Sequence, residues 1–296
     1  MTARPPWKEP ARVPTRIGKA LALVVVIALV MTPFLVVVST SIASPREVTA
    51  NGGWVLWPTE PTLSAYEQIW QGGIVTRALL VSAGVTLAGT ALSLATTALL
   101  AYALARPEVV GGRPLLMLIL FTFLFPPGMI PAYLVVKNVG LLDSYASLIL
   151  PVLLNVFNLI VMRGFFQSIP AELFEAARLD GAGDWRILWR VVVPLSKAAL
   201  AVVGLFYAVG YWNSWFTGML YLQDTTKWPL QLVLRTYVTS GGVLADPSAQ
   251  SDGAFAAAPQ TIQMAVVVMA TLPIVLVYPF LQRYFVRGVM TGAIKT

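Results

Sequence analysis

Few side chains in this chain could do chemistry, and the types on which most enzymes depend are missing. The 296 residues include no Cys and no His, which excludes thiolate nucleophiles, imidazole bases and the usual zinc ligands. A catalytic site would then need a Ser–Lys pair or paired Asp residues, and the apolar segments hold neither. We therefore expect no catalytic residue, no bound cofactor and no metal site in this chain.

Uncharged polar and aromatic residues inside apolar segments are the candidates for handling a solute. Asn155 and Asn158 are three residues apart and would share one face of a helix. Tyr211, Trp212 and Asn213 are consecutive in another apolar segment. These residues could line a polar path, or they could form hydrogen bonds between packed helices. Both interpretations stay open.

The composition requires a membrane around much of the chain. Hydrophobic residues make up 57% and charged residues only 11%, and the mean hydropathy is +0.76. A soluble core of this length could not bury so many apolar side chains. Lipid is therefore expected to solvate a large part of the surface.

Six stretches without Asp, Glu, Lys or Arg have the length of membrane spans. A bilayer core about 30 Å thick requires roughly 20 apolar helical residues. The predicted spans are residues 21–42, 79–104, 115–136, 146–162, 200–222 and 262–281. Residues 44–77 and 223–260 are expected to form external loops, the first with a short helix near 63–70.

The third predicted span cannot be a regular helix. It contains Pro126, Pro127, Gly128 and Pro131, and each proline removes a backbone hydrogen bond. We expect a kink or a break there, of the kind that is tolerated where backbone lines a cavity or packs against protein.

The distribution of basic residues predicts the orientation. With the N-terminus in the cytoplasm, 15 of the 20 Lys and Arg residues fall on the cytoplasmic side, as the positive-inside rule requires. This also explains the net charge of +7 without nucleic acid. We therefore expect both termini inside, a basic cytoplasmic segment at 1–20 and one six-span transmembrane domain at 21–296.

The longest cytoplasmic loop, residues 168–194, is expected to form a helix–turn–helix. Pro170 suits the start of a first helix, Gly181 breaks it, Asp184 caps a second helix, and Pro194 ends that helix. The predicted fold is therefore an all-α polytopic membrane protein with six transmembrane helices and a protruding cytoplasmic helix–turn–helix.

This loop also resembles a known family. Glu175-Ala176-Ala177, then Gly181, then Val191-Val192-Val193-Pro194 is similar to the cytoplasmic "EAA" loop of binding-protein-dependent ABC importer permeases, in which the last motif is usually Ile-x-Leu-Pro. The stretches that resemble the oligosaccharide branch, with its maltose-type inner-membrane subunits, are Lys227-Trp228-Pro229-Leu230-Gln231, Tyr278-Pro279-Phe280-Leu281 and Gly288-Val289-Met290-Thr291.

The resemblance implies a function and a set of partners. The chain would be a permease subunit of an ATP-driven sugar importer in the bacterial cytoplasmic membrane. Its partners would be a second permease, two cytoplasmic ATPase domains and an external solute-binding protein. ATP and Mg would bind the ATPase, since this chain has no phosphate-binding G-x-x-x-x-G-K-[ST] loop. The residues implied in ATPase coupling are Glu175, Ala176, Ala177, Asp180, Gly181 and Pro194.

Two other functions fit the sequence less well. A secondary carrier is disfavoured because proton-coupled carriers usually hold charged residues at membrane depth, and the predicted spans hold none. An intramembrane enzyme is disfavoured because the catalytic residue types described above are missing.

Overall fold

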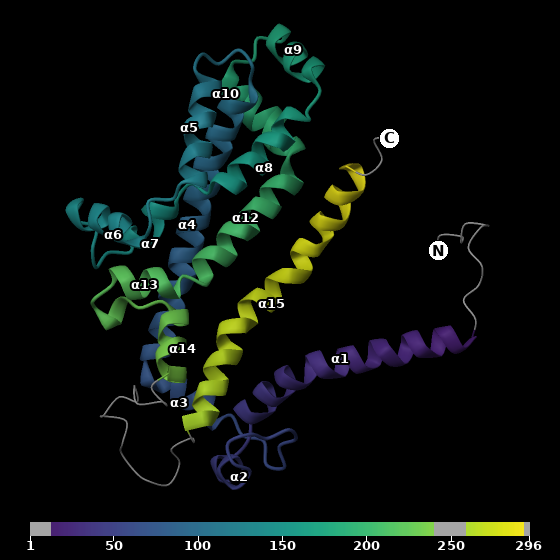
Figure 1. Cartoon of the computed structure of the whole chain (residues 1–296), viewed down its shortest axis with the longest axis vertical. Helices are drawn as coiled ribbons and strands as arrows, with labels where there is room; N and C mark the ends of the chain where they lie inside the picture. The colour runs from purple at the N-terminus through teal and green to yellow at the C-terminus, as the bar shows by residue number, and fades with distance from the viewer. Residues whose placement is uncertain (1–12, 240–258, 293–296) are drawn as a thin grey trace. The chain divides into compact units, whose positions relative to one another are not determined.

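Helices make up the described part of the chain. The computed structural model describes residues 13–239 and 259–292, in which no strand occurs (Figure 1). This confirms the predicted all-α class. Two parts of earlier predictions, residues 1–12 of the basic segment and 240–258 of the second external loop, lie outside the described residues. The chain divides into unit 1 (Met1–Gln71 and Ala245–Val268) and unit 2 (Gly72–Leu244 and Met269–Thr296).

Unit 1 is organised around the end of its long first helix. Its helices are α1 (Val13–Ser41), α2 (Pro45–Ala50), α3 (Ser64–Gly72) and the start of α15 (Pro259–Gly292). The Thr40 hydroxyl accepts a hydrogen bond from the Val55 N–H at 3.0 Å and lies 3.2 Å from the Val55 carbonyl, to which it donates. This pair holds the following loop against the end of α1. The helix predicted near residues 63–70 is present as α3.

Unit 2 contains the remaining elements. They are α4 (Ile74–Ala105), α5 (Gly112–Leu124), α6 (Met129–Asn138), α7 (Ala146–Ile149), η1 (Leu150–Val152), α8 (Val156–Gln167), α9 (Ala171–Leu179), α10 (Asp184–Ile187), the π-helical turn η2 (Leu188–Val192), α11 (Val193–Leu195), α12 (Lys197–Trp212), α13 (Trp215–Tyr221), η3 (Thr225–Lys227), α14 (Leu230–Thr239) and the rest of α15.

Helix α4 is the centre of unit 2, where it packs against α12 and α8. Gly89, Ser93 and Thr97 are spaced four residues apart on α4 and are buried. Such a row of small residues lets a neighbouring helix approach closely. Figure 1 shows α4, α8 and α12 together in this part of the molecule.

Several helices have the length and composition of membrane spans. Three qualify alone: Val13–Ser41, Ile74–Ala105 and Gln260–Pro279. Three bent pairs also qualify: Gly112–Leu124 with Met129–Asn138, Ala146–Val152 with Val156–Gln167, and Asp184–Leu195 with Lys197–Trp212. If each pair forms one span, the described residues hold up to six, the number predicted from the sequence.

The third predicted span is broken, as its prolines indicated. Helices α5 and α6 meet at an angle of 116°. Between them Gly128 adopts a φ of +85°, a conformation that favours glycine. The fourth predicted span is bent as well, by 54°, where Asn155 begins α8.

The predicted fifth span, residues 200–222, is wrong in its second half. Helix α12 ends at Trp212, and α13 follows as a separate helix after Asn213 and Ser214. Asn213 closes α12 because its backbone N–H and its side-chain amide both donate to the Val209 carbonyl. The apolar run therefore continues past the point where a local polar contact ends the helix.

The second helix of the 168–194 loop also differs from the prediction. Gly183, rather than Asp184, occupies its N-cap, and Asp184 forms an ion pair instead. Pro194 does not end the helix, which continues through Leu195. The preceding turn, Leu188–Val192, is π-helical, and both π-turns and prolines are known causes of helix distortion. The chain then bends by 84° into α12.

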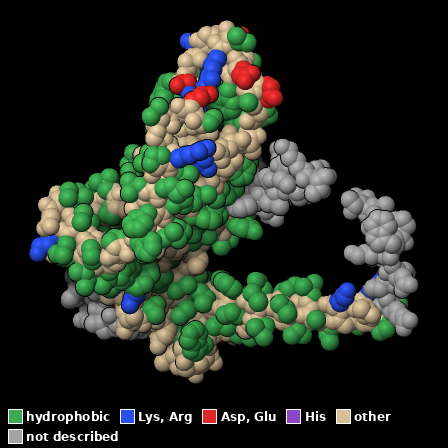
Figure 2. All heavy atoms as spheres, turned by 45° about the horizontal axis from the view of Figure 1, so that its top comes forward, with side chains coloured by type: hydrophobic (Ala, Val, Ile, Leu, Met, Phe, Trp, Pro, Cys, Tyr) green, Lys and Arg blue, Asp and Glu red, His purple; other side chains and the backbone are tan. Residues whose placement is uncertain are grey.

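Charged side chains gather at one end of unit 2. In Figure 2 acidic and basic groups lie together near the end that carries α9 and α10 in Figure 1, whereas hydrophobic side chains cover most of the adjoining surface. Apolar side chains exposed on α5 and α6 include Phe121, Phe123, Leu124, Phe125, Met129 and Ile130. A surface of this kind suits lipid or another chain.

Candidate functional site

A pocket in unit 2 brings together most of the polar residues singled out in the apolar segments. It has a volume of about 330 Å³ and lies where α7 and η1, α8, α12 and α13 meet. Asn155, Asn158, Tyr211 and Asn213 all line it. Trp212 does not, since its indole N–H donates to the Ala270 carbonyl at 2.9 Å. We call this site the α8–α12 pocket.

The start of α8 places the two asparagines. Asn155 caps the helix, because its Oδ1 accepts the Asn158 N–H at 3.1 Å. Asn155 is exposed, whereas Asn158 is only 4% exposed. The Asn155 side chain is therefore bonded to the Asn158 backbone, and both residues line the pocket.

Two buried tyrosines of α12 form another wall of the pocket. The Tyr211 hydroxyl lies 2.7 Å from Ser93 Oγ on α4. The Tyr207 hydroxyl lies 2.7 Å from Thr97 Oγ1 and accepts the Asn155 N–H at 2.9 Å. These contacts tie the wall to α4 and to the start of α8.

The lining of the α8–α12 pocket is uncharged. Its other polar members are Ser214 and Thr217, and its aromatic members include Phe206 and Phe216. A concave, largely apolar site with a few convergent polar groups is typical of small-molecule binding. Among the described residues no cluster of acidic side chains could hold a metal ion.

The residues predicted for ATPase coupling lie on and around α9. Glu175 and Ala176 are exposed, whereas Ala177 is half-buried and packs on the core. Asp180 is the C-cap of α9. Gly181 follows with a φ of +73°, and its N–H donates to the Arg178 carbonyl at 3.0 Å.

Gly181 is suited to this turn because the left-handed conformation strains other residues. Pro194 is exposed in α11, well along the chain from α9. Five of the six predicted coupling residues lie between positions 175 and 181, at the end of α9, whereas Pro194 belongs to α11.

Two ion pairs connect this segment to the end of α4, and sequence reasoning missed both. Arg106 bonds Asp184 at 2.6 Å and lies over the Tyr102 ring. Arg178 bonds Glu108 at 2.8 Å. The Arg178 guanidinium beside Glu108 lowers the pKa of that carboxyl, and Glu108 raises the pKa of Arg178. We call these contacts the α9–α10 ion pairs.

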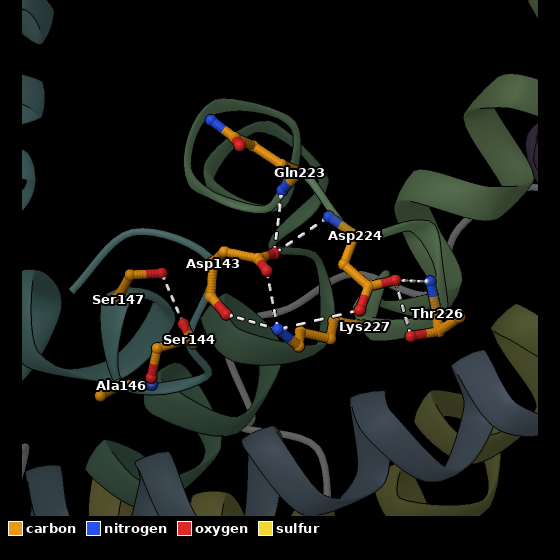
Figure 3. A network of polar contacts seen from close by, with 8 residues as sticks. All are labelled: Asp143, Ser144, Ala146, Ser147, Gln223, Asp224, Thr226 and Lys227. Carbon is orange, nitrogen blue, oxygen red and sulfur yellow. Dashed lines mark hydrogen bonds and ion pairs between the residues drawn. The ribbon is translucent and has the colours of Figure 1, made fainter. Parts of the chain in front are cut away.

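A second polar cluster, also missed, joins the turn after α6 to the turn after α13 (Figure 3). Asp143 Oδ1 accepts the N–H groups of Gln223 and Asp224 at 3.1 and 3.0 Å, and Asp143 Oδ2 lies 2.7 Å from Lys227 Nζ. Lys227 also donates to the Asp143 carbonyl at 2.9 Å. We call this cluster the Asp143 network.

Electrostatics reinforce the Asp143 network. The Lys227 ammonium, followed by the Asp224 N–H, lowers the pKa of the Asp143 carboxyl. Asp143 in turn raises the pKa of Lys227. Lys227 belongs to one of the sequence stretches that carried the family resemblance. This membership was the signal in the sequence that could have drawn attention to Lys227.

Comparison with known proteins places the chain in a family. Residues 97–291 match the family model described as "Binding-protein-dependent transport system inner membrane component". This range contains the α8–α12 pocket, the α9–α10 ion pairs and the Asp143 network.

Similar proteins agree with this match. The chain is 47% identical over 264 residues to the Polygalacturonan/rhamnogalacturonan transport system permease protein YtcP of Bacillus subtilis (strain 168), covering 89% of this chain and 92% of that one. It is 44% identical over 271 residues to Protein LplC of the same strain, covering 90% of each.

A solved structure supports the fold as well. It is described as the crystal structure of a bacterial ABC transporter involved in the import of the acidic polysaccharide alginate. One of its chains has a TM-score of 0.87 and 33% identity, covering 95% of this chain and 100% of that chain. This chain therefore belongs to the binding-protein-dependent transport system inner membrane components, the permeases of ABC importers.

Proposed function

We propose that this chain forms half of the translocation path of an ATP-driven importer for an oligosaccharide. The observation that carries the proposal is the α8–α12 pocket, which combines amides, hydroxyls and aromatic rings without a charged side chain. Sugar rings offer hydroxyl groups to amides and apolar faces to aromatic side chains. The similarity to permeases named for polygalacturonan/rhamnogalacturonan and for alginate supports the same class of solute.

The exposed face of α9 would dock on a separate ATPase, which would bind ATP and Mg. Ala176 is small and exposed, and the exposed side chains of Leu173 and Leu179 lie on either side of it along the helix. A small residue between two apolar ones allows close packing of a partner surface. Glu175 would offer a charge to a basic group there, and Gly181 would supply the turn.

The other partners follow from the family and from the surface. An importer of this type would need a second permease, two ATPase domains and an external solute-binding protein. The exposed apolar side chains of α1 and α5 are suited to lipid and to the second permease. The basic residues favour a cytoplasmic location for both termini and for α9, in the bacterial cytoplasmic membrane.

Coupling through α9 can be tested with Ala176→Arg in the complete transporter. The added side chain should prevent close packing and should leave a charge without a partner in the interface. We expect ATPase co-purification to be lost and ATP-driven oligosaccharide uptake in proteoliposomes to fall about tenfold or more.

Val110→Arg is the matched control. Val110 is fully exposed in the loop between α4 and α5, and it receives the same side chain. The transporter with Val110→Arg should still co-purify with the ATPase and should still take up the oligosaccharide. If Ala176→Arg behaves like this control, α9 is not the coupling surface; if wild type binds no ATPase, the importer proposal itself fails.

A further inference from the structure

The tyrosine hydroxyls in the α8–α12 pocket already have partners within the chain. Tyr207 is bonded to Thr97 and to the Asn155 N–H, and Tyr211 is bonded to Ser93. A hydroxyl group has one hydrogen to donate and few acceptor positions. These two groups are therefore engaged in helix packing, and they present mainly their rings to the pocket.

The position of the Tyr211 ring is fixed by Gly89. A Cβ atom at Gly89 would lie 2.7 Å from Tyr211 Cζ, which is closer than real atoms approach. The ring thus rests directly on the α4 backbone. Tyr211 shapes the pocket and cannot move toward a solute without losing this contact.

Asn158 differs from the tyrosines. Its side chain is 4% exposed and lines the pocket, but its carboxamide forms no hydrogen bond to any described residue. Its backbone N–H is bonded to Asn155, so the helix cap does not involve the Asn158 side chain. The carboxamide is not among the fully buried unpaired groups, so its accessible part lies at the pocket, where a solute can bond to it.

A second polar atom nearby is also unpaired. The Ser214 hydroxyl lies at the start of α13, is buried, and has no hydrogen-bond partner among the described residues. Ser214 lines the same pocket as Asn158. Because this hydroxyl has no accessible surface, Ser214 borders the cavity without offering a hydrogen bond to it, and the Asn158 amide is the unpaired group that does.

We propose that Asn158 distinguishes the solute by hydrogen bonding to its ring hydroxyls, whereas Tyr207 and Tyr211 only shape the pocket. This inference rests on the proposed function and names the group that selects the substrate. A carboxamide offers two donors and one acceptor oxygen, which matches adjacent hydroxyl groups of a pyranose.

Uptake of deoxy analogues by the complete transporter tests the inference. The probes are a galacturonan trisaccharide and a set of monodeoxy analogues, each lacking one ring hydroxyl. Wild type should transport at least one analogue about tenfold less efficiently than the parent, because the unmade bond leaves the amide unpaired. Asn158→Leu should abolish this preference by lowering parent uptake to the level of that analogue.

Thermal unfolding separates recognition from structure. Asn158→Leu replaces an unpaired amide with an apolar group of similar size, so its Tm should not fall. Asn158→Ala, measured in the same way, is a second variant that also removes the amide. It applies if a leucine side chain does not fit the space that the Asn158 side chain occupies. Asn138→Leu is the matched control, because Asn138 is exposed at the end of α6, outside the pocket.

The outcomes are distinct. Loss of the analogue preference at position 158, with Tm and the Asn138→Leu control unchanged, supports the inference. A lower Tm with the preference intact assigns Asn158 a structural role and overturns it. Failure of wild type to import any of the trisaccharides with ATP overturns the proposed substrate class, and the inference with it.

Discussion

The α9–α10 ion pairs and the Asp143 network both connect distant parts of unit 2, but they are built differently. Glu108 and Arg178 meet through side chains alone, which are 60% and 43% exposed. Asp143 instead uses its carboxylate, its carbonyl and its N–H, which donates to the Tyr221 carbonyl at 2.8 Å. One contact joins two flexible side chains, and the other joins two backbone turns.

This difference indicates which region is held firmly. Exposed ion pairs contribute little to stability, because water competes for both charges. Hydrogen bonds from a carboxylate to backbone N–H groups fix the geometry of the backbone itself. The Asp143 network joins turns that lead into α7 and out of α13, both of which border the α8–α12 pocket. We infer a firmly held pocket and a weaker polar attachment of α9 to the loop after α4.

The largest effect is expected from Asp143→Ala. It leaves two backbone N–H groups without their acceptor, removes the carboxylate partner of Lys227, and puts Ala at a position with a φ of +56°. Both changes destabilise the fold. The Tm of the purified protein in lipid nanodiscs should fall by several degrees, and uptake should fall with it.

Asp143→Asn sharpens this test. Its amide oxygen can still accept the two N–H groups, and Asn tolerates the left-handed conformation, but its pairing with Lys227 is lost. Its Tm should lie between those of wild type and Asp143→Ala. Equal losses for both variants would mean that the charge, and not the backbone contacts, holds these turns.

Acidification should have a smaller effect with a defined direction. The folded-state pKa of Asp143 is lowered by Lys227, so its contribution to stability is present above the unfolded-state pKa and is lost as pH falls through the folded value. The Tm should therefore decline below about pH 4, near the unperturbed carboxyl pKa.

Glu108 has a pKa shifted in the same direction, and it is the control for this experiment. Asp143→Asn should flatten the acid decline in Tm more than Glu108→Gln does. A Tm that does not change on acidification, or an equal flattening by both variants, would contradict the comparison.

The sequence predicted the membrane helices from composition, because apolar length is a local property. The runs that became α1, α4 and α15 were found in this way. Composition cannot locate a turn within an apolar run, so the end of α12 at Asn213 was missed. Pro194 was expected to end a helix; a π-helical turn precedes it, and the helix ends one residue later, at Leu195.

The candidate site was predictable only as a set of residue types. The asparagines and tyrosines within the predicted spans indicated which residues could line a pocket. Consecutive residues on a helix point in different directions, and Trp212, next to Tyr211, does not line the pocket. The bonds that position the tyrosines join residues far apart in the sequence: Ser93 with Tyr211, Thr97 with Tyr207, and Asn155 with Tyr207. A single sequence contains no signal for such pairs beyond the four-residue spacing of small residues on α4.

The smallest effect on stability is expected from Glu108→Gln, and it tests the other side of the comparison. The substitution removes the ion pair with Arg178, but both side chains are largely solvated. The Tm should stay within the error of the measurement. If α9 must change position during transport, loosening this contact should alter ATP-driven uptake more than it alters Tm. A Tm loss as large as that of Asp143→Ala would show that the α9–α10 ion pairs hold their segment as firmly as the Asp143 network holds the pocket.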